Sequence, residues 1–107
     1  MSSTNVDNRR LSVETIHELL ADRQRRLVLV HLHETDKSTF PLSNLVEVLQ
    51  VGEDEESKRR ARINLIHKHL PKLADYDIVE YDRQNETVRY CGDAQLETLV
   101  EISTFYE

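Results

Sequence analysis

The sequence predicts a single, mainly α domain with a small β-hairpin, and three features support this prediction. A chain of 107 residues is long enough for one domain with a modest core. It contains only 2 glycines and 2 prolines, and its apolar residues recur at helical spacing over most of its length. Residues 78–90 are the exception, because they hold two β-rich runs on either side of a polar turn.

Three segments are expected along the chain. Residues 1–10, MSSTNVDNRR, offer almost nothing to bury, so we expect a flexible lead-in and no signal peptide there. Residues 11–92 carry the apolar patterns of a folded domain, and residues 93–107 are expected to form a C-terminal helix.

Two helices are expected at the start of the domain. Ser12 is a suitable N-cap for a helix whose apolar residues lie at helical spacing: Val13, Ile16 and Leu20. Asp22 can cap a second helix, although by periodicity the apolar run at residues 27–30 suits a buried strand as well as a buried helix. The straight-chain Arg and Gln side chains that follow Asp22 favour the helix.

A short strand and a short helix are expected next. Residues 38–41 should be extended, because Pro41 disfavours a helical conformation at the residue before it, and we expect an edge strand there. An amphipathic helix with Ser43 near its start follows, with apolar positions at Leu42, Leu45, Val46 and Leu49. The acidic connection at residues 52–56 ends it.

A basic helix is expected at residues 57–70. Four apolar residues at i, i+3, i+7 and i+10 predict its buried face: Ile63, Ile66, Leu70 and Leu73. The opposite, mostly cationic face is expected to contain Lys58, Ala61, Leu65, Lys68 and Lys72. Pro71 lacks a backbone donor, so we expect a bend or break within residues 68–72.

A hairpin and a last helix complete the expected fold. The strands are expected at residues 78–81 and 87–90, and Asn85 in the turn can adopt a left-handed conformation. Asp93 is a suitable cap for the last helix, whose apolar arc is too broad for one packing partner: Leu96, Leu99, Val100, Ile102, Phe105 and Tyr106. We therefore expect a homodimer formed through residues 94–106.

A short helix, a longer basic helix and a β-hairpin in succession predict a winged helix-turn-helix domain. The segments LSVETIHELLADRQRRLVLVHL, RARINLIHKHLPKLADYDIVEYD and TVRY, within residues 11–91, resemble a haloarchaeal winged helix-turn-helix family known as a domain of unknown function. Members of that family are regarded as transcriptional regulators. The resemblance implies a winged helix that dimerises through its C-terminal helix, and it identifies neither an operator nor a ligand.

This fold makes double-stranded DNA the expected partner, with a recognition helix at residues 57–70 in the major groove and a wing at residues 78–91. Arg pairs with guanine and Asn with adenine, so we expect base contacts from Arg59, Arg60, Arg62 and Asn64. We expect contacts with the DNA backbone from Lys68, Arg83 and Arg89, and Lys58 completes the basic face.

The alternative is a winged-helix protein-protein interaction module that does not bind DNA specifically. The formal net charge of the chain is −6, and the acidic residues 53–56 can pair with Lys58, Arg59 and Arg60 at helical spacing. The same carboxylates would repel phosphate if they faced DNA. The sequence leaves both functions open.

Metal, cofactor and enzymatic functions are not expected. The pairs His31/His33 and His67/His69 are spaced i, i+2, about 200° apart on a helix, so neither pair can chelate a metal through one face. Cross-helix ligation stays open, although there is no group of cysteines to support it. The chain has no Gly-rich phosphate loop, no HExxH motif and no recognisable nucleophile.

The remaining features indicate a cytoplasmic protein. Cys91 is the single cysteine, which excludes an internal disulfide and agrees with a reducing compartment, and we expect it to be buried at the end of a strand. No apolar run approaches the roughly 20 residues that a membrane span requires, so no membrane partner is expected.

Overall fold

The computed structural model describes residues 11–105, and the side chains of residues 11–102. The flexible lead-in expected at residues 1–10 and the side chains of Phe105 and Tyr106 lie outside this description. The elements follow one another as α2 (Val13–Ala21), α3 (Arg23–Glu34), β1 (Thr39–Pro41), α4 (Leu42–Leu49), α5 (Glu55–Asn64), the π-helical turn η1 (Leu65–His69), α6 (Leu70–Asp75), β2 (Val79–Asp82), β3 (Thr87–Tyr90) and α7 (Ala94–Phe105).

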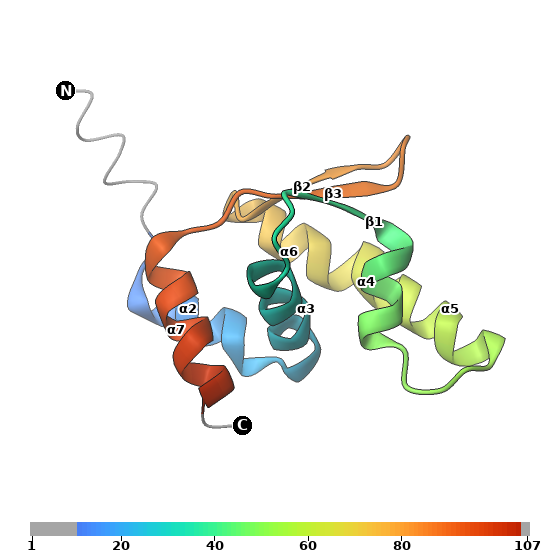
Figure 1. The fold of residues 1–107 in the computed structure, drawn as a ribbon, viewed down its shortest axis with the longest axis horizontal. Helices are drawn as coiled ribbons and strands as arrows, with labels where there is room; N and C mark the ends of the chain where they lie inside the picture. Colours follow the sequence, from blue (N-terminus) through green and yellow to red (C-terminus); the bar gives the residue numbers. More distant parts are fainter. Residues whose placement is uncertain (1–10, 106–107) are drawn as a thin grey trace.

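The fold is mainly helical with a small three-stranded antiparallel sheet, as expected, and it is compatible with a winged helix. The strand order is β1-β3-β2, so the hairpin β2–β3 is extended by β1 at its edge. Val88 in the central strand pairs with Phe40 on one side and with Tyr81 on the other. In Figure 1 the sheet lies along one side of the helices, and the hairpin extends beyond them.

Three expected N-caps are confirmed by hydrogen bonds from backbone N–H groups to side-chain oxygens. Ser12 Oγ accepts the N–H of Thr15 at 3.1 Å, and Asp22 Oδ1 accepts that of Arg25 at 3.0 Å. Asp93 Oδ1 accepts the N–H of Leu96 at 2.9 Å. Such bonds satisfy donors that the first turn of a helix leaves unpaired. The ambiguous apolar run at residues 27–30 lies in α3 and is therefore helical.

The core lies between the sheet and the helices, with α3 at its centre. Helix α3 contacts α2, α4 and α7. The largest fully buried side chains come from every part of the described chain and include Ile16, Leu29, Leu32, Phe40, Leu45, Leu65, Leu70, Ile78 and Leu96. Burial of this apolar surface is the main favourable contribution to folding.

The basic helix expected at about residues 57–70 begins at Glu55 and contains a π-helical turn. Asp54 caps α5 with a bond from the N–H of Ser57 to its Oδ1 at 3.3 Å, so the helix begins at Glu55 and not at residue 57. In η1 the N–H of Leu70 donates to the carbonyl of Leu65, five residues earlier. Pro71 cannot donate to a carbonyl, and the helix accommodates it through this wider turn just before the proline.

The expected buried face is confirmed at Leu70 and Leu73 and in part at Ile66, but it is wrong at Ile63. Ile63 is 46% exposed, whereas Ala61 and Leu65, expected on the cationic face, are buried. A π-helical turn inserts one residue into the helical repeat. Leu70 and Leu73 therefore lie on the same side of the helix as Ala61 and Leu65. A regular α-helical spacing had placed them on the same side as Ile63 instead.

The turn of the hairpin also differs from the expectation. Glu86, and not Asn85, has the left-handed conformation, with φ of 53°. Asn85 instead has its side chain fixed, because its Nδ2 donates to Asp82 Oδ2 at 2.8 Å. Its backbone N–H also donates to Asp82, at 3.2 Å.

Helix α7 packs on the domain itself. Its residues Leu96 and Val100 are buried, and the helix contacts α3. Part of the apolar arc that was expected to form a dimer interface is therefore covered by the same chain. Ile102 remains 47% exposed, and Leu99 is half-buried.

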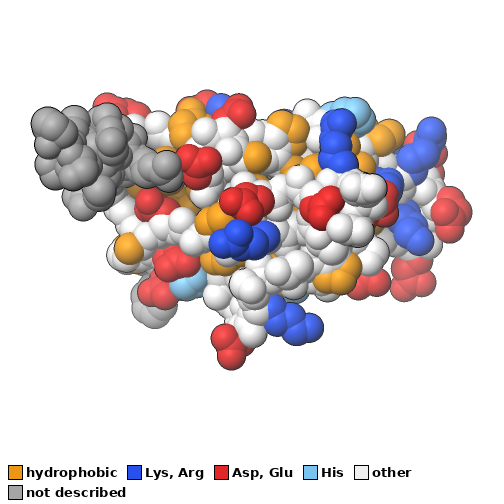
Figure 2. Space-filling model, turned by 90° about the horizontal axis from the view of Figure 1, so that it is seen from above, with side chains coloured by type: hydrophobic (Ala, Val, Ile, Leu, Met, Phe, Trp, Pro, Cys, Tyr) orange, Lys and Arg blue, Asp and Glu red, His pale blue; other side chains and the backbone are white. Residues whose placement is uncertain are grey.

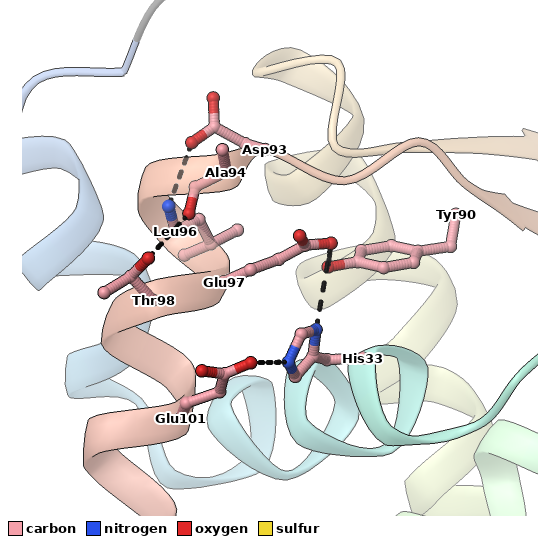
Figure 3. Close-up of polar contacts among 8 residues, drawn as sticks. All are labelled: His33, Tyr90, Asp93, Ala94, Leu96, Glu97, Thr98 and Glu101. Atoms are coloured by element: carbon pink, nitrogen blue, oxygen red, sulfur yellow. Dashed lines mark hydrogen bonds and ion pairs between the residues drawn. The ribbon is translucent and has the colours of Figure 1, made fainter.

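Polar contacts reinforce this packing (Figure 3). Tyr90 Oη donates to Glu97 Oε2 at 2.9 Å, and His33 Nε2 lies 2.8 Å from Glu101 Oε2. Burial and the neighbouring Glu97 raise the pKa of Tyr90. Gly92 has φ of 78°, and a Cβ atom there would lie 2.8 Å from Glu97 Oε2, so a glycine suits this approach to α7.

Candidate nucleic-acid interface

The candidate interface combines α4 and α5, the candidate helix-turn-helix, with the hairpin of β2 and β3. Helices α4 and α5 contact each other directly. The side chains of Arg62 on α5 and Glu86 at the end of the hairpin turn form an ion pair. The candidate recognition helix and the candidate wing are therefore joined by a direct contact.

The first two turns of α5 present three cations to solvent. Arg59 and Arg60 are 67% and 73% exposed at their side chains, and both pair with Glu56, at 2.9 Å and 3.6 Å. The hydrogen bond from Arg59 and its positive charge lower the pKa of Glu56, and Glu56 in turn raises the pKa of Arg59. Lys58 is exposed and has no ion pair within the described part of the chain.

Asn64 and Lys68 lie toward α3 and its cap. Asn64 Nδ2 donates to Gln24 Oε1 at 3.2 Å, and Lys68 Nζ lies 3.2 Å from Asp22 Oδ2. Burial acts to raise the pKa of Asp22, but hydrogen bonds from the Arg25 N–H and from Lys68 outweigh it, so that pKa is lowered. These two candidate DNA contacts also help to hold the candidate recognition helix against α3.

The hairpin carries the other two candidate cations. Arg89 on β3 pairs with Glu80 on β2, with 3.0 Å between Nη1 and Oε1. The two residues face each other across the sheet register, so the pair lies on one face of the hairpin. Arg83 in the turn is exposed and forms no ion pair with any described residue.

Acidic and basic side chains alternate over this region. Most of the sequence-predicted DNA-binding cations have a carboxylate partner, and the partners are Asp22, Glu56, Glu80 and Glu86. Figure 2 shows one face of the molecule, on which Lys and Arg side chains lie in separate groups beside Asp and Glu side chains. Of the acidic residues 53–56, Glu56 supplies the expected pairing, with Arg59 and Arg60.

A polar network between α3 and the candidate recognition helix was not expected from the sequence. Gln24 Oε1 lies 2.9 Å from His69 Nε2 and also accepts the bond from Asn64. His69 is fully buried, and its Nδ1 has no hydrogen-bond partner. Burial lowers the pKa of His69 against the opposing effect of Asp22, so the neutral ring is favoured.

The other histidines and Cys91 have separate environments. His31 Nε2 lies 2.8 Å from Asn44 Oδ1, and His67 is exposed. Among residues 11–105 there is no group of three or more His, Cys, Asp or Glu side chains that could hold a metal ion. Cys91 is exposed and not buried as expected: its backbone N–H still donates to the Ile78 carbonyl at 2.8 Å, and the alternation along the strand places its side chain on the same side as the exposed Arg89.

None of the helices in the described part of the chain is both long enough and apolar enough to cross a lipid bilayer.

The fold defines a small, mainly helical domain with a three-stranded antiparallel sheet, of a type compatible with winged-helix proteins. The model of a protein family described as Domain of unknown function (DUF7344) matches residues 17–89, and the chain belongs to that family. The matched segment runs from α2 to β3 and contains all the candidate DNA-binding residues, while α7 lies outside it. No curated protein and no solved structure matches the chain.

Proposed function

We propose that this protein is a DNA-binding transcriptional regulator of the winged-helix type. In this proposal α5 enters the major groove of double-stranded DNA, and the hairpin of β2 and β3 contacts the backbone as the wing. One observation carries the proposal: exposed cations occur on both elements, with Lys58, Arg59 and Arg60 on α5 and Arg83 and Arg89 on the hairpin.

The carboxylate partners do not prevent DNA binding. An exposed ion pair contributes about 0–1 kcal/mol, whereas a hydrogen bond to a charged group in a closed interface contributes about 1.5–3 kcal/mol. A phosphate can therefore replace Glu56 as the partner of Arg59 or Arg60. Lys58 and Arg83 have no ion pair to break within the described residues, so they are the most available phosphate ligands.

Asn64 and Lys68 have a second role in this proposal. Their bonds to Gln24 and Asp22 hold the recognition helix on α3, and a base contact by Asn64 requires its bond to Gln24 to open. Base contacts from Arg59 and Arg60 require only that their exposed pairs with Glu56 open, and a base contact from Arg62 requires that its pair with Glu86 open.

We also infer that the protein forms a homodimer through residues 94–106 and acts in the cytoplasm. Leu99 and Ile102 support the dimer, because they lie one turn apart on α7 and remain half-buried and 47% exposed after Leu96 and Val100 have been buried within the chain. Two copies would present two recognition helices to successive major grooves. A chain that sediments as a monomer at all accessible concentrations contradicts this part of the proposal.

A protein-protein interaction module is the second candidate function. It is favoured by Glu56 and Glu86, whose carboxylates lie on the same surface as the arginines and would repel phosphate. A partner protein with an acidic surface could pair with Lys58 and Arg83. Such binding would not bring Glu56 and Glu86 close to the phosphates of a DNA duplex.

The test is selection of bound sequences from a random pool of double-stranded DNA by the full chain. We also propose a haloarchaeal origin for the protein, and selection is therefore carried out both at moderate and at molar salt. We expect one sequence motif to be enriched by the native protein and lost in the Lys58→Ala/Arg59→Ala/Arg60→Ala variant. Lys37→Ala, which removes an exposed cation outside α5 and the hairpin, is the control and should retain the motif. Failure of the native protein to enrich any motif supports the interaction module instead.

A further inference from the structure

Ile63 is a large apolar side chain at the outer surface of the candidate recognition helix, where it is 46% exposed. Successive residues of an α-helix are about 100° apart, so Ala61 and Leu65 each lie about 160° around the axis from Ile63. Both are buried in the core. Ile63 therefore points almost directly away from the domain.

This exposure follows from the way in which the helix is built. The π-helical turn Leu65–His69 places Leu70 and Leu73 in line with Ala61 and Leu65, and these residues complete the contact of the helix with the core. Ile63 is left on the opposite side. Rotating the helix to bury Ile63 would expose Leu65, which has no accessible surface in the structure.

The surroundings of Ile63 are mostly charged: its neighbouring arginines are each paired with a carboxylate, and the partly buried Ile66 is an apolar neighbour at i+3. Arg59 precedes it by one helical turn, His67 follows it by about one turn, and Arg60 and Arg62 lie on either side. A single exposed isoleucine is ordinary on a protein surface. Its position among cations on an exposed helix, however, suits a ligand that offers both negative charge and a small apolar group.

The major groove of DNA offers both features. Phosphates border the groove, and thymine is the one standard base that presents a methyl group in it, at C5. We infer that Ile63 contacts the C5 methyl group of a thymine and thereby helps to select the DNA sequence. This inference rests on the proposed function. In it, the arginines bind phosphate and guanine, and Ile63 specifies sequence by an apolar contact with thymine.

The test uses the sequence selected by the native protein and replaces each thymine singly with deoxyuridine, which lacks the C5 methyl group. Affinities are measured by fluorescence anisotropy for the native protein and for Ile63→Ala. At one thymine position in each half-site we expect deoxyuridine to weaken native binding by about fourfold, the change that follows from uncovering one buried methyl group. Ile63→Ala should bind the thymine duplex more weakly and be indifferent to deoxyuridine at that position.

Val13→Ala is the matched control, because Val13 is 52% exposed on α2, outside the candidate interface. It should keep the native discrimination between thymine and deoxyuridine. Thermal unfolding of Ile63→Ala checks that the variant is folded. If no motif is selected, the proposed function fails and the inference fails with it. If a motif is selected but the native protein and Ile63→Ala respond equally to every deoxyuridine, the proposed function stands and the role of Ile63 is overturned.

Discussion

Glu86 in the hairpin turn forms an ion pair with Arg62 on α5, and its backbone carbonyl accepts the N–H of Leu42 at 2.8 Å. Leu42 is the first residue of α4, so Glu86 joins the hairpin to both α4 and α5. The candidate wing and the candidate recognition helix are thereby held in one relative position. Pre-organisation of this kind reduces the entropy lost when a partner binds.

The side chain of Glu86 is expected to weaken DNA binding while it orders the wing. Glu86→Gln removes the negative charge and keeps the size of the side chain, so Arg62 becomes available to a phosphate. We expect affinity for the selected duplex to rise by roughly twofold to fivefold, since an exposed ion pair contributes up to about 1 kcal/mol. Anisotropy titration at moderate salt measures this change.

Glu80→Gln is the control for this experiment, because Glu80 pairs with Arg89 and leaves the pair between Arg62 and Glu86 intact. A fall in the affinity of Glu86→Gln would mean that order in the wing matters more than the released charge. That outcome would contradict the expectation.

Lys58 is expected to bind phosphate without regard to sequence. Lys58→Ala should weaken binding to specific and non-specific duplexes by similar factors, and it should reduce the slope of log affinity against log salt by about 1. Titrations over a range of salt concentrations provide the slope. Lys37→Ala should leave the slope unchanged. A variant at Lys58 that alters sequence preference but not the slope would assign it to base recognition.

The π-helical turn can be tested by single-residue deletion. Deletion of His67 in a Pro71→Ala background should convert η1 to an α-helical turn and keep Leu65 and Leu70 on one face, because a π-helical turn amounts to one inserted residue. The Pro71→Ala change is needed because proline in a helix interior costs about 3 kcal/mol. We expect urea unfolding to remain cooperative, with little loss of stability relative to Pro71→Ala alone.

Deletion of Lys72 in the same background is the contrasting variant. This deletion rotates Leu73 by about 100° relative to Leu70. The side chain of Leu73, which is fully buried in the native chain, therefore leaves the core. A loss of about 2–5 kcal/mol is expected, as for other large truncations in a core. Equal losses for the two deletions would show that η1 does not act as an insertion.

His69 is expected to make stability depend on pH. Its pKa in the folded chain is lowered from 6.5 by burial, so between the two values the unfolded chain binds more protons. The stability that the neutral ring contributes is complete above about pH 6.5 and is lost as the pH falls toward the lowered pKa. The slope from this group cannot exceed about 1.4 kcal/mol per pH unit.

His69→Gln should remove this part of the pH dependence, because glutamine can still donate to Gln24 and does not titrate. His67→Gln, at an exposed histidine in the same π-helical turn, should retain it. Urea unfolding between pH 5 and pH 7.5 compares the two variants. An unchanged slope in His69→Gln would assign the pH dependence to other groups.

Local signals in the sequence were sufficient to predict most of the elements. Ser12, Asp22 and Asp93 mark helix starts through hydrogen bonds that each cap makes within three residues of itself. Pro41 and the alternating strands similarly act through neighbouring residues. The register of the candidate recognition helix could not be predicted in this way. Pro71 indicates a disturbance of the helix, but the sequence does not show whether the helix bends, breaks or widens.

The candidate site was less predictable than the fold. The residue types that favour DNA were visible in the sequence, but their partners are distant in the chain. Glu86 lies 24 residues from Arg62, and Gln24 lies 40 residues from Asn64. Spacing alone could suggest the pairs of Glu56 with Arg59 and Arg60, because only these lie on one helix. The exposure of Ile63 could not be anticipated while Pro71 was expected to bend or break the helix.

The most direct test of the central claim is an NMR titration of the full, isotope-labelled chain with the selected DNA duplex. The claim requires the largest backbone amide shifts at residues 58–63 of α5 and around Arg83 in the hairpin turn. The outer surface of α2 around Val13 should stay unchanged. Saturable shifts confined to those two places are the expected result. Shifts concentrated elsewhere, or no shifts at duplex concentrations well above those of the protein, would contradict the account.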